Sequence, residues 1–229
     1  KMKRLFDIFI SAVALILLTP VFLIVIFILK FSGEGEILFL QKRVGKNRNI
    51  FNVYKFTTML KNSEKTGSGT LTLKNDPRVL PVGKFLRKSK INELPQFLNI
   101  LKGDMSIIGP RPLVPEGESN YSEDVSIKIR SIRPGATGIG SLVLRDEESY
   151  YAHRQDAHAF YRNIISPYKG DLELWYVKNQ SLYLDLKILF LTVLAILVPS
   201  FDPLKYFENI PQMPEAMITS RANNLPTEN

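Results

Sequence analysis

The longest apolar stretch of this chain lies near its N-terminal end. Ser11 to Leu29 contains no charged residue, while Lys1, Lys3 and Arg4 precede it and Lys30 follows it. A helix of this length rises ~1.5 Å per residue and can reach across roughly 30 Å of hydrocarbon. The pattern therefore predicts a membrane helix in this segment.

The pair Thr19-Pro20 falls in the middle of this apolar stretch and argues against a straight helix. Proline has no backbone N–H to donate, so it bends or breaks a helix. Cations on both flanks give no charge asymmetry that would send one end across the membrane. The residues alone leave two topologies open: a spanning helix, and a re-entrant helix-break-helix that bends at Thr19 and Pro20.

After the apolar stretch the pattern changes to short strand-like segments. Glu36–Leu40 and Ile50–Phe56 have strand composition, and the basic, glycine-containing link Gly45–Asn49 joins them. A β-hairpin is therefore predicted. The polar segment Asn62–Asn75, rich in Gly, Ser, Thr and Lys, predicts a surface loop.

A helix is predicted next. Four apolar residues recur at i, i+3, i+4 and i+7, the spacing of one buried helical face: Leu94, Phe97, Leu98 and Leu101. Asn92 is a good N-cap, and this places Glu93 in the first turn, where the helix dipole favours an anion. Arg87 lies just upstream and Arg111 just downstream. A carboxylate among cations indicates a place where a phosphate substrate could be handled.

The C-terminal half predicts mostly helical structure. Helices are expected from Ser149 onward with an interruption near Ser181, and Ile188–Val198 is too short to cross a bilayer, which leaves an interfacial or a buried helix. Asp146 and Glu147 suggest a solvated helix start. From Pro203 the chain becomes proline-rich and polar, and residues 209–229 predict a poorly ordered tail.

Composition narrows the class of protein. Through Pro112 the chain has 19 Lys and Arg against 7 Asp and Glu, and after it 11 against 15, for a net charge of +8. A basic N-terminal half beside an apolar segment suits anionic lipid and nucleotide phosphates. No nucleic-acid motif is present, so no nucleic-acid partner is expected. With no cysteine and two histidines, neither a disulfide nor a histidine metal cluster is expected.

These patterns predict an α+β fold, a mostly helical small membrane-associated domain with a short β-hairpin. The expected division is a membrane helix over 1–31, a domain with interfacial helices over 32–202, and a polar tail over 203–229. A chain of 229 residues is long enough for one sizeable core.

Several motifs resemble those of the monotopic phosphoglycosyl transferases, bacterial sugar transferases that act on a polyprenol phosphate. They are the runs Ser89–Gln96, Leu101–Ser106 and Gly109–Pro112, the earlier blocks Gln41–Gly45 and Tyr54–Met59, and the later blocks Arg133–Gly138, Tyr176–Asn179 and Ser181–Lys187. The resemblance implies transfer of a sugar phosphate from a UDP-sugar to undecaprenyl phosphate, with release of UMP and a requirement for Mg²⁺. It also implies a re-entrant form for the membrane helix, a catalytic role for the domain over 32–202, and a monotopic protein on the cytoplasmic face of the bacterial inner membrane.

The chain departs from the family pattern at three places. Asn92 stands where the family normally carries its nucleophilic aspartate, and Thr57 stands where a cation is usual. Residues 139–148 replace a usual Ala-Gln-Val-Asn-Gly-Arg run. An asparagine side chain is not an ionised nucleophile and is a weaker magnesium ligand than a carboxylate. The covalent mechanism of the family therefore cannot be transferred intact.

The candidate site residues follow from the motifs and the resemblance. Glu93 and Asn92 are the catalytic candidates, and Glu93 is also the metal candidate. The candidates for binding substrate phosphate are Arg87, Arg111, Arg133, Lys55 and Asp185. Asp185 lies in an apolar helix and should be paired with a cation or with backbone donors.

Three functions remain open at this stage: a transferase that works through Glu93, an inactive nucleotide-sugar-binding member of the family, and a membrane scaffold. Expected partners are a UDP-sugar, undecaprenyl phosphate and membrane lipid, with a homodimer left open.

Overall fold

The computed structural model describes residues 2–61, 63, 76–115, 121–151, 154–198 and 201–224. Apart from Ser63, the predicted loop Asn62–Asn75 lies outside these ranges, as does His153. The helices are α1 (Met2–Lys30), α2 (Pro81–Lys88), α3 (Gln96–Lys102), α4 (Glu123–Arg130), α5 (Ile139–Val143), α6 (Ala157–Phe160), α7 (Ser166–Asn179), α8 (Leu182–Leu197) and α9 (Glu215–Asn224). The strands are β1 (Leu38–Val44), β2 (Ile50–Phe56), β3 (Ser106–Ile108) and β4 (Gly135–Thr137).

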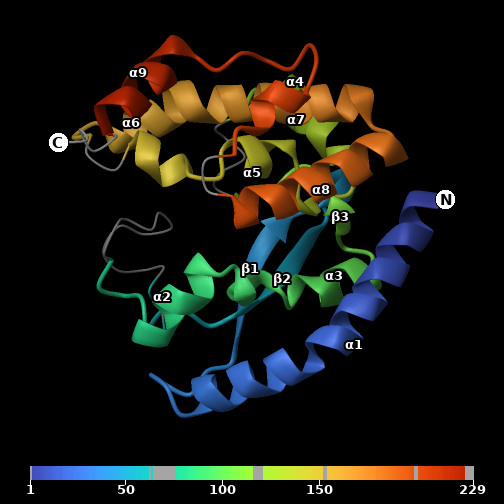
Figure 1. Cartoon of the computed structure of the whole chain (residues 1–229), viewed down its shortest axis with the longest axis vertical. Coiled ribbons are helices and arrows are strands. Elements are labelled where there is room, and N and C mark those ends of the chain that lie inside the picture. Colours follow the sequence, from blue (N-terminus) through green and yellow to red (C-terminus); the bar gives the residue numbers. More distant parts are fainter. Residues whose placement is uncertain are drawn as a thin grey trace. The chain divides into compact units, whose positions relative to one another are not determined.

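The described part of the chain is mostly helical, with two small sheets, β1–β2 and β3–β4 (Figure 1). The predicted hairpin is confirmed, although its first strand begins later than expected. Two compact units are present: Lys1–Arg43 with Ile50–Ile107, and Val44–Asn49 with Ile108–Asn229. The predicted domain boundaries, after residues 31 and 202, stay predictions.

Helix α1 is continuous through Pro20 and changes direction near its middle (Figure 1). Because Pro20 has no N–H, the carbonyl of Ile16 loses its helical partner. The Thr19 hydroxyl donates to the Leu15 carbonyl at 2.8 Å, a contact that often accompanies a bend. The predicted break is therefore a bend within one helix. Among the described residues, α1 is the one helix long and apolar enough to cross a membrane.

Polar contacts fix the N-terminal part of α1 against the end of α3. Asp7 is buried, and its Oδ1 accepts hydrogen bonds from the Ser106 hydroxyl and the Ile107 N–H, both at 3.0 Å. Arg4 donates to the carbonyls of Ile100 and Leu101. These carbonyls belong to the last turn of α3, where a cation is favoured. This end of α1 is therefore more than a charged flank, because Arg4 and Asp7 hold it against the protein.

The second half of α1 packs in an apolar cluster. Val25 and Leu29 are buried with Phe56 of β2 and Leu86 of α2. Phe22 adds an edge-on contact with Phe56, with 5.4 Å between ring centroids. This cluster joins the bent helix to the hairpin and to α2 within the first unit.

The predicted start of the helix at Asn92 is wrong. Helix α3 begins at Gln96, and Ile91–Glu93 form a separate 3₁₀ turn. In an α-helix the Ile91 carbonyl would accept from residue 95, but Pro95 has no N–H. The Leu94 N–H donates to the Ile91 carbonyl instead, at 3.1 Å, which gives the tighter turn.

The predicted buried face of this helix is also wrong. Gln96, Asn99 and Ile100 are the buried residues of α3, whereas Leu98 is 39% exposed. The polar side chain of Asn99 faces inward because it bonds to the backbone of β2. A hydrogen-bonding requirement thus outweighs the apolar periodicity.

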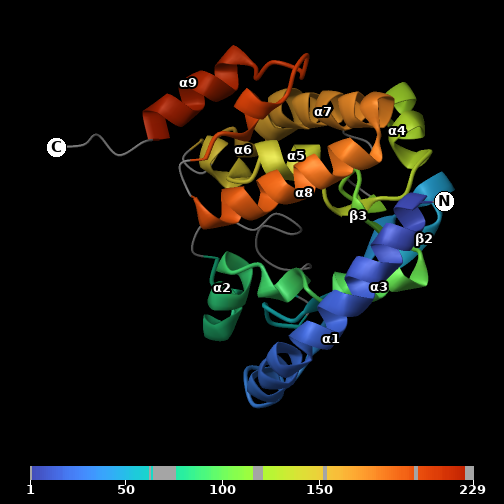
Figure 2. The ribbon, with the colours of Figure 1, turned by 45° about the vertical axis from the view of Figure 1, so that its right-hand side comes forward.

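In the second unit, α5 packs against both α7 and α8 (Figure 2). A π-helical turn, Tyr161–Ile165, joins α6 to α7. The predicted interruption near Ser181 is confirmed, because the Ser181 side chain caps α8 by accepting from the Leu184 N–H at 3.1 Å. Helix α8 buries Ile188 on one side and leaves Phe190 63% exposed on another.

The prediction of a poorly ordered C-terminal tail is wrong for the part that forms α9. Met217 is fully buried, and the Ser220 hydroxyl donates to the Tyr150 carbonyl at 2.6 Å. The buried side chain of Met217 and the hydrogen bond of Ser220 therefore dock this polar segment. Residues 225–229 lie outside the described part of the chain.

Candidate functional site

The first unit brings three of the predicted site residues together. Lys55 lies on β2, and its Nζ is 3.9 Å from Oε1 of Glu93 in the 3₁₀ turn. The two side chains are 15% and 24% exposed, so solvent and a substrate can reach them. A cation beside the carboxylate reduces the repulsion that an incoming phosphate would meet.

Asn92 lies directly beside this ion pair in the same turn. Its Oδ1 is buried and has no hydrogen-bond partner among the described residues. A buried amide oxygen without a partner is costly, and it often marks a place where a ligand or ion supplies the missing contact. Asn92 and Glu93 thus present two kinds of oxygen ligand, an amide and a carboxylate.

Asn99 holds β2 and α3 in register behind the ion pair. Its Oδ1 accepts from the Tyr54 N–H at 2.9 Å, and its Nδ2 donates to the Asn52 carbonyl at 2.7 Å. Tyr54 is the neighbour of Lys55, so these bonds fix the strand at the point where it approaches Glu93. Asn99 was not among the predicted site residues, because the apolar spacing predicted that other residues form the buried face of this helix.

The candidate Arg87 and Asp104, a residue of the matched run Leu101–Ser106, also belong to the first unit. Arg87 is in the last turn of α2, which packs against the 3₁₀ turn that contains Glu93. Asp104 lies beyond the end of α3, where its Oδ2 is 3.3 Å from Asn99 Nδ2 and 3.9 Å from Lys102 Nζ. Asp104 therefore helps to hold the side chain of Asn99 in place.

The second unit holds the remaining candidates, Arg111, Arg133 and Asp185. Arg111 is half-buried in the segment that follows β3, and Arg133 is exposed after α4. Asp185 is buried, as predicted, and its Oδ1 accepts from the Tyr176 hydroxyl at 2.5 Å. Burial and this bond raise the pKa of Tyr176. The predicted pairing of Asp185 with a cation or with backbone donors stays a prediction.

The glycines of the Arg133–Gly138 block allow this segment to pack closely against the backbone of Gly109. A Cβ atom at Gly135 would lie 2.1 Å from the Gly109 nitrogen, and one at Gly138 would lie 2.2 Å from the Gly109 oxygen. The Gly135 N–H already donates to the Pro110 carbonyl at 2.9 Å. The Gly135 N–H is thus used within the backbone, which favours a structural turn at this glycine.

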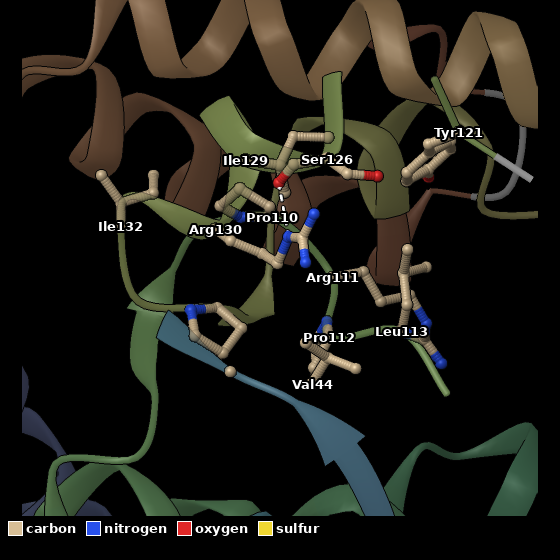
Figure 3. Close-up of a pocket in the computed structure, with 12 residues that line it drawn as sticks. Val44, Pro110, Arg111, Pro112, Leu113, Tyr121, Ser126, Ile129, Arg130 and Ile132 are labelled. Atoms are coloured by element: carbon tan, nitrogen blue, oxygen red, sulfur yellow. Dashed lines mark hydrogen bonds between the residues drawn. The ribbon is translucent and has the colours of Figure 1, made fainter. Parts of the chain in front are cut away.

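A small hollow lies beside Arg111 (Figure 3). Its volume of about 20 Å³ has room for roughly one water molecule. Arg130 lines it, and its Nε donates to the Ser126 carbonyl at 2.8 Å. This hollow is too small for a nucleobase or a sugar.

Sequence reasoning missed a buried charged cluster on α7. Glu173 is 2% exposed, and its Oε1 accepts from the Arg111 N–H at 3.3 Å. Lys169, one turn earlier, pairs with Glu147 at 2.8 Å. The predicted solvated helix start is confirmed at Asp146, whose side chain is 63% exposed just before the 3₁₀ helix Glu147–Tyr150, whereas the side chain of Glu147 is only 22% exposed. A sequence signal did exist: Lys169, Glu173 and Tyr176 recur at i, i+4 and i+7, as the residues of a single helical face do.

Burial raises the pKa of the Glu173 carboxyl to about 7, although the Arg111 N–H and the charges of Lys169 and Arg111 act to lower it. This carboxyl therefore changes its charge near neutral pH.

Comparison with known proteins identifies the family. The family model for bacterial sugar transferases matches residues 1–199. The chain is 37% identical over 209 residues to the exopolysaccharide production protein ExoY of Sinorhizobium fredii, covering 85% of this chain and 84% of that protein. It is 37% identical over 197 residues to the UDP-N-acetylgalactosamine-undecaprenyl-phosphate N-acetylgalactosaminephosphotransferase of Aeromonas hydrophila, covering 85% of this chain and 43% of that protein. It is 34% identical over 210 residues to the undecaprenyl-phosphate galactose phosphotransferase of Salmonella typhimurium, covering 86% of this chain and 40% of that protein.

Proposed function

The chain belongs to the bacterial sugar transferase family, and we propose that it moves a sugar phosphate from a UDP-sugar to undecaprenyl phosphate, releasing UMP. Relatives named for this type of transfer support the substrates. The observation that carries the proposal is the Lys55–Glu93 pair beside Asn92, inside the part of the chain that the family model matches. The product would begin a surface glycan or glycoconjugate.

The proposed reaction is a nucleophilic displacement at phosphorus. An oxygen forms a bond to the β-phosphorus of the UDP-sugar, and the bond from that phosphorus to the bridging oxygen breaks. UMP leaves with the electron pair. The sugar phosphate finally rests on the phosphate of undecaprenyl phosphate, so that a lipid-linked sugar diphosphate forms.

Glu93 is the carboxylate of the site that we assign to this chemistry. It can attack the β-phosphorus itself, or it can orient the lipid phosphate for direct attack. Lys55 lies close enough to neutralise either the carboxylate or a phosphate oxygen. Asn92 has no ionised oxygen, so it binds and orients but does not attack.

The residues present fit a magnesium ion bound together with substrate. Among the described residues no group of three or more His, Asp or Glu side chains could hold a metal alone. However, Asn92 Oδ1 is buried without a hydrogen-bond partner among the described residues, and Glu93 is the next residue in the same 3₁₀ turn. Mg²⁺ commonly takes one or two protein oxygens and completes its shell with water and substrate phosphates. When bound there, the ion would neutralise charge on the pyrophosphate.

A second function is favoured by one observation, the asparagine at position 92. A protein without its aspartate could retain nucleotide sugar without turning it over. Arg87 and Lys55 would still bind the donor in that case. The two functions differ in a single measurable product, UMP.

The assay that tests the function is UMP release from a panel of UDP-sugars with undecaprenyl phosphate and Mg²⁺. We expect UMP with at least one sugar, matched by one lipid-linked product per UMP. If a UDP-sugar binds but no donor yields UMP, the chain is instead a nucleotide-sugar-binding protein.

The long apolar helix and the family suggest membrane association. We further propose a re-entrant helix on the cytoplasmic face of the inner membrane, supported by the bend at Pro20 and the cations on both flanks. The chain has no cysteine, so single cysteines can be placed without further changes. We expect a membrane-impermeant thiol reagent to label Met2→Cys and Asn47→Cys from the same side.

Labelling of these two variants from opposite sides would contradict the re-entrant topology. Pro20→Leu is the matched test of the bend, because it restores a backbone N–H to the Ile16 carbonyl. In that background a shift of the Met2→Cys label to the opposite side is expected.

A further inference from the structure

A second cavity, wider than the hollow beside Arg111, lies within the second unit. Its walls come from the end of α5 and the residues that follow it, from the last turn of α8, and from the segment 201–204. Its volume is about 250 Å³, room for roughly eight water molecules at about 30 Å³ each. Pockets for small molecules begin at roughly 300 Å³, so this cavity suits a ligand of single-ring size.

Part of the wall belongs to the run in which the chain departs from the family pattern. Leu142, Val143, Arg145 and Asp146 line the cavity, and all four lie within residues 139–148. The family pattern therefore gives no role to these side chains.

Arg145 is held by two parts of the protein. Its Nη1 donates to the Ala195 carbonyl in the last turn of α8, and its Nη2 and Nε donate to Asp146 Oδ2 at 3.0 and 3.2 Å. In a continuing helix the Ala195 carbonyl would accept from residue 199, but this residue is a proline, which has no N–H. The guanidinium thus takes the place of a helical donor, at the end of the helix where a cation is favoured.

Two carboxylates of the cavity wall are each oriented through one oxygen. Oδ2 of Asp146 accepts from Arg145. Oδ1 of Asp202 accepts from the Leu204 N–H at 3.1 Å, a bond that caps the 3₁₀ helix Pro203–Tyr206. Within the described part of the chain, the second oxygen of each carboxylate has no hydrogen-bond partner. The cavity therefore offers two oriented acceptor oxygens to a ligand.

The remaining wall is mostly apolar and includes one aromatic ring. Leu142 and Met213 contribute apolar surface, and Phe201 contributes the ring. The Phe201 ring is stacked on Tyr206, with 5.2 Å between the centroids and 27° between the planes. This stacking fixes the ring, and because Phe201 is half-buried and lines the cavity, part of its surface is left for a ligand.

This combination of groups selects the chemistry of the ligand. The hydroxyls of a sugar donate to carboxylate oxygens, and the C–H groups of a sugar ring pack on an aromatic side chain. Two aspartates repel a phosphate, and Arg145 repels a cation. Among the described residues no group of three or more His, Asp or Glu side chains could hold a metal ion.

We propose that this cavity binds one neutral sugar ring, a hexose or an N-acetylhexosamine, with Asp146 and Asp202 as the acceptors of its hydroxyls. The lining residues all belong to the second unit, so the inference does not rest on the Lys55–Glu93 pair. It adds a saccharide site to the proposed function, and binding at this site does not require UMP release.

The test measures binding of the methyl glycosides of glucose, galactose, N-acetylglucosamine and N-acetylgalactosamine. The full chain is held in lipid nanodiscs, because a maltoside detergent would itself supply sugar rings. Isothermal titration and saturation-transfer NMR are the two readouts. We expect at least one glycoside to bind with a Kd of roughly 1 mM or lower, and inorganic phosphate not to displace it.

Asp202→Asn is the discriminating variant. Asparagine keeps an oxygen for the Leu204 N–H and replaces the other oxygen with an amino group. We expect glycoside binding to weaken about tenfold with little change in Tm, since Asp202 is exposed. Asp146→Asn tests the other acceptor with the same expected loss. Asp171→Asn, at an exposed position of α7, is the matched control and should bind like the parent.

The inference is overturned if no glycoside binds the parent at about 20 mM, or if both folded aspartate variants bind like the parent. The first criterion needs no variant. Displacement of the glycoside by a UDP-sugar at that donor's own affinity would also overturn it, because the glycoside would then occupy the donor site. A parent that binds glycosides as expected but releases no UMP would contradict the proposed transferase function and support the saccharide site.

Discussion

Glu93→Gln is expected to lower UMP release by about 10³-fold or more, the scale of losing a nucleophile or base. The substitution keeps the size of the side chain and removes the charge that Lys55 faces at 3.9 Å. Because the Glu93 side chain is 24% exposed, the fold should survive, and the Tm should change little. The initial rate of UMP release at saturating donor and lipid is the quantity to measure.

Glu123→Gln provides the control, since it makes the same chemical change at an exposed position on α4. It should retain the parent's rate. A folded Glu93→Gln protein with a rate within tenfold of the parent would remove Glu93 from the chemistry, and the role of the Lys55–Glu93 pair would then be structural.

Arg111→Lys is expected to lower kcat/KM for the UDP-sugar by roughly 10- to 100-fold. The substitution keeps the positive charge but loses the planar fork that binds two phosphate oxygens at once. The backbone of residue 111 lies between two prolines and has little freedom to move. A lysine at this position therefore cannot shift to regain the second phosphate contact.

Arg162→Lys, at an exposed position of the π-helical turn, is the matched control and should leave kcat/KM unchanged. If Arg111→Lys keeps the parent's affinity and turnover, the assignment of Arg111 to phosphate is wrong. If the variant instead loses its folded structure, Arg111 supports the fold rather than the substrate.

The elements that the sequence predicted correctly are those whose signals are local. The strand composition around a basic, glycine-containing link predicted the hairpin, and Ser181 predicted the start of α8 because its cap bond lies within four residues. The burial of Asp185 also followed from its apolar neighbours. None of these inferences required knowledge of a distant contact.

The errors have a common physical cause, which is that distant polar contacts outweigh local patterns. Asn99 faces inward because the backbone of β2 needs its amide, although the apolar spacing predicted another buried face. Glu173 was missed because its partner, the Arg111 N–H, lies more than sixty residues earlier. The start of α3 differs from the prediction for a local reason, since the Leu94 N–H closes a separate 3₁₀ turn at Ile91 before the helix begins at Gln96.

The central claim is that Glu93, rather than residue 92, performs the chemistry of the reaction in this chain. Asn92 contributes a buried amide oxygen beside Glu93 and no ionised group. If this is the working arrangement, an aspartate at position 92 adds a charge that the reaction does not require. If the chain is instead a disabled member of its family, the same change restores what was lost.

The direct measurement is therefore UMP release by the parent and by Asn92→Asp, side by side, with undecaprenyl phosphate, Mg²⁺ and the panel of UDP-sugars. The account predicts that both proteins release UMP with the same preferred sugar, at rates within about fivefold of each other. A silent parent together with an active Asn92→Asp variant would contradict it and would show that residue 92 carries the chemistry.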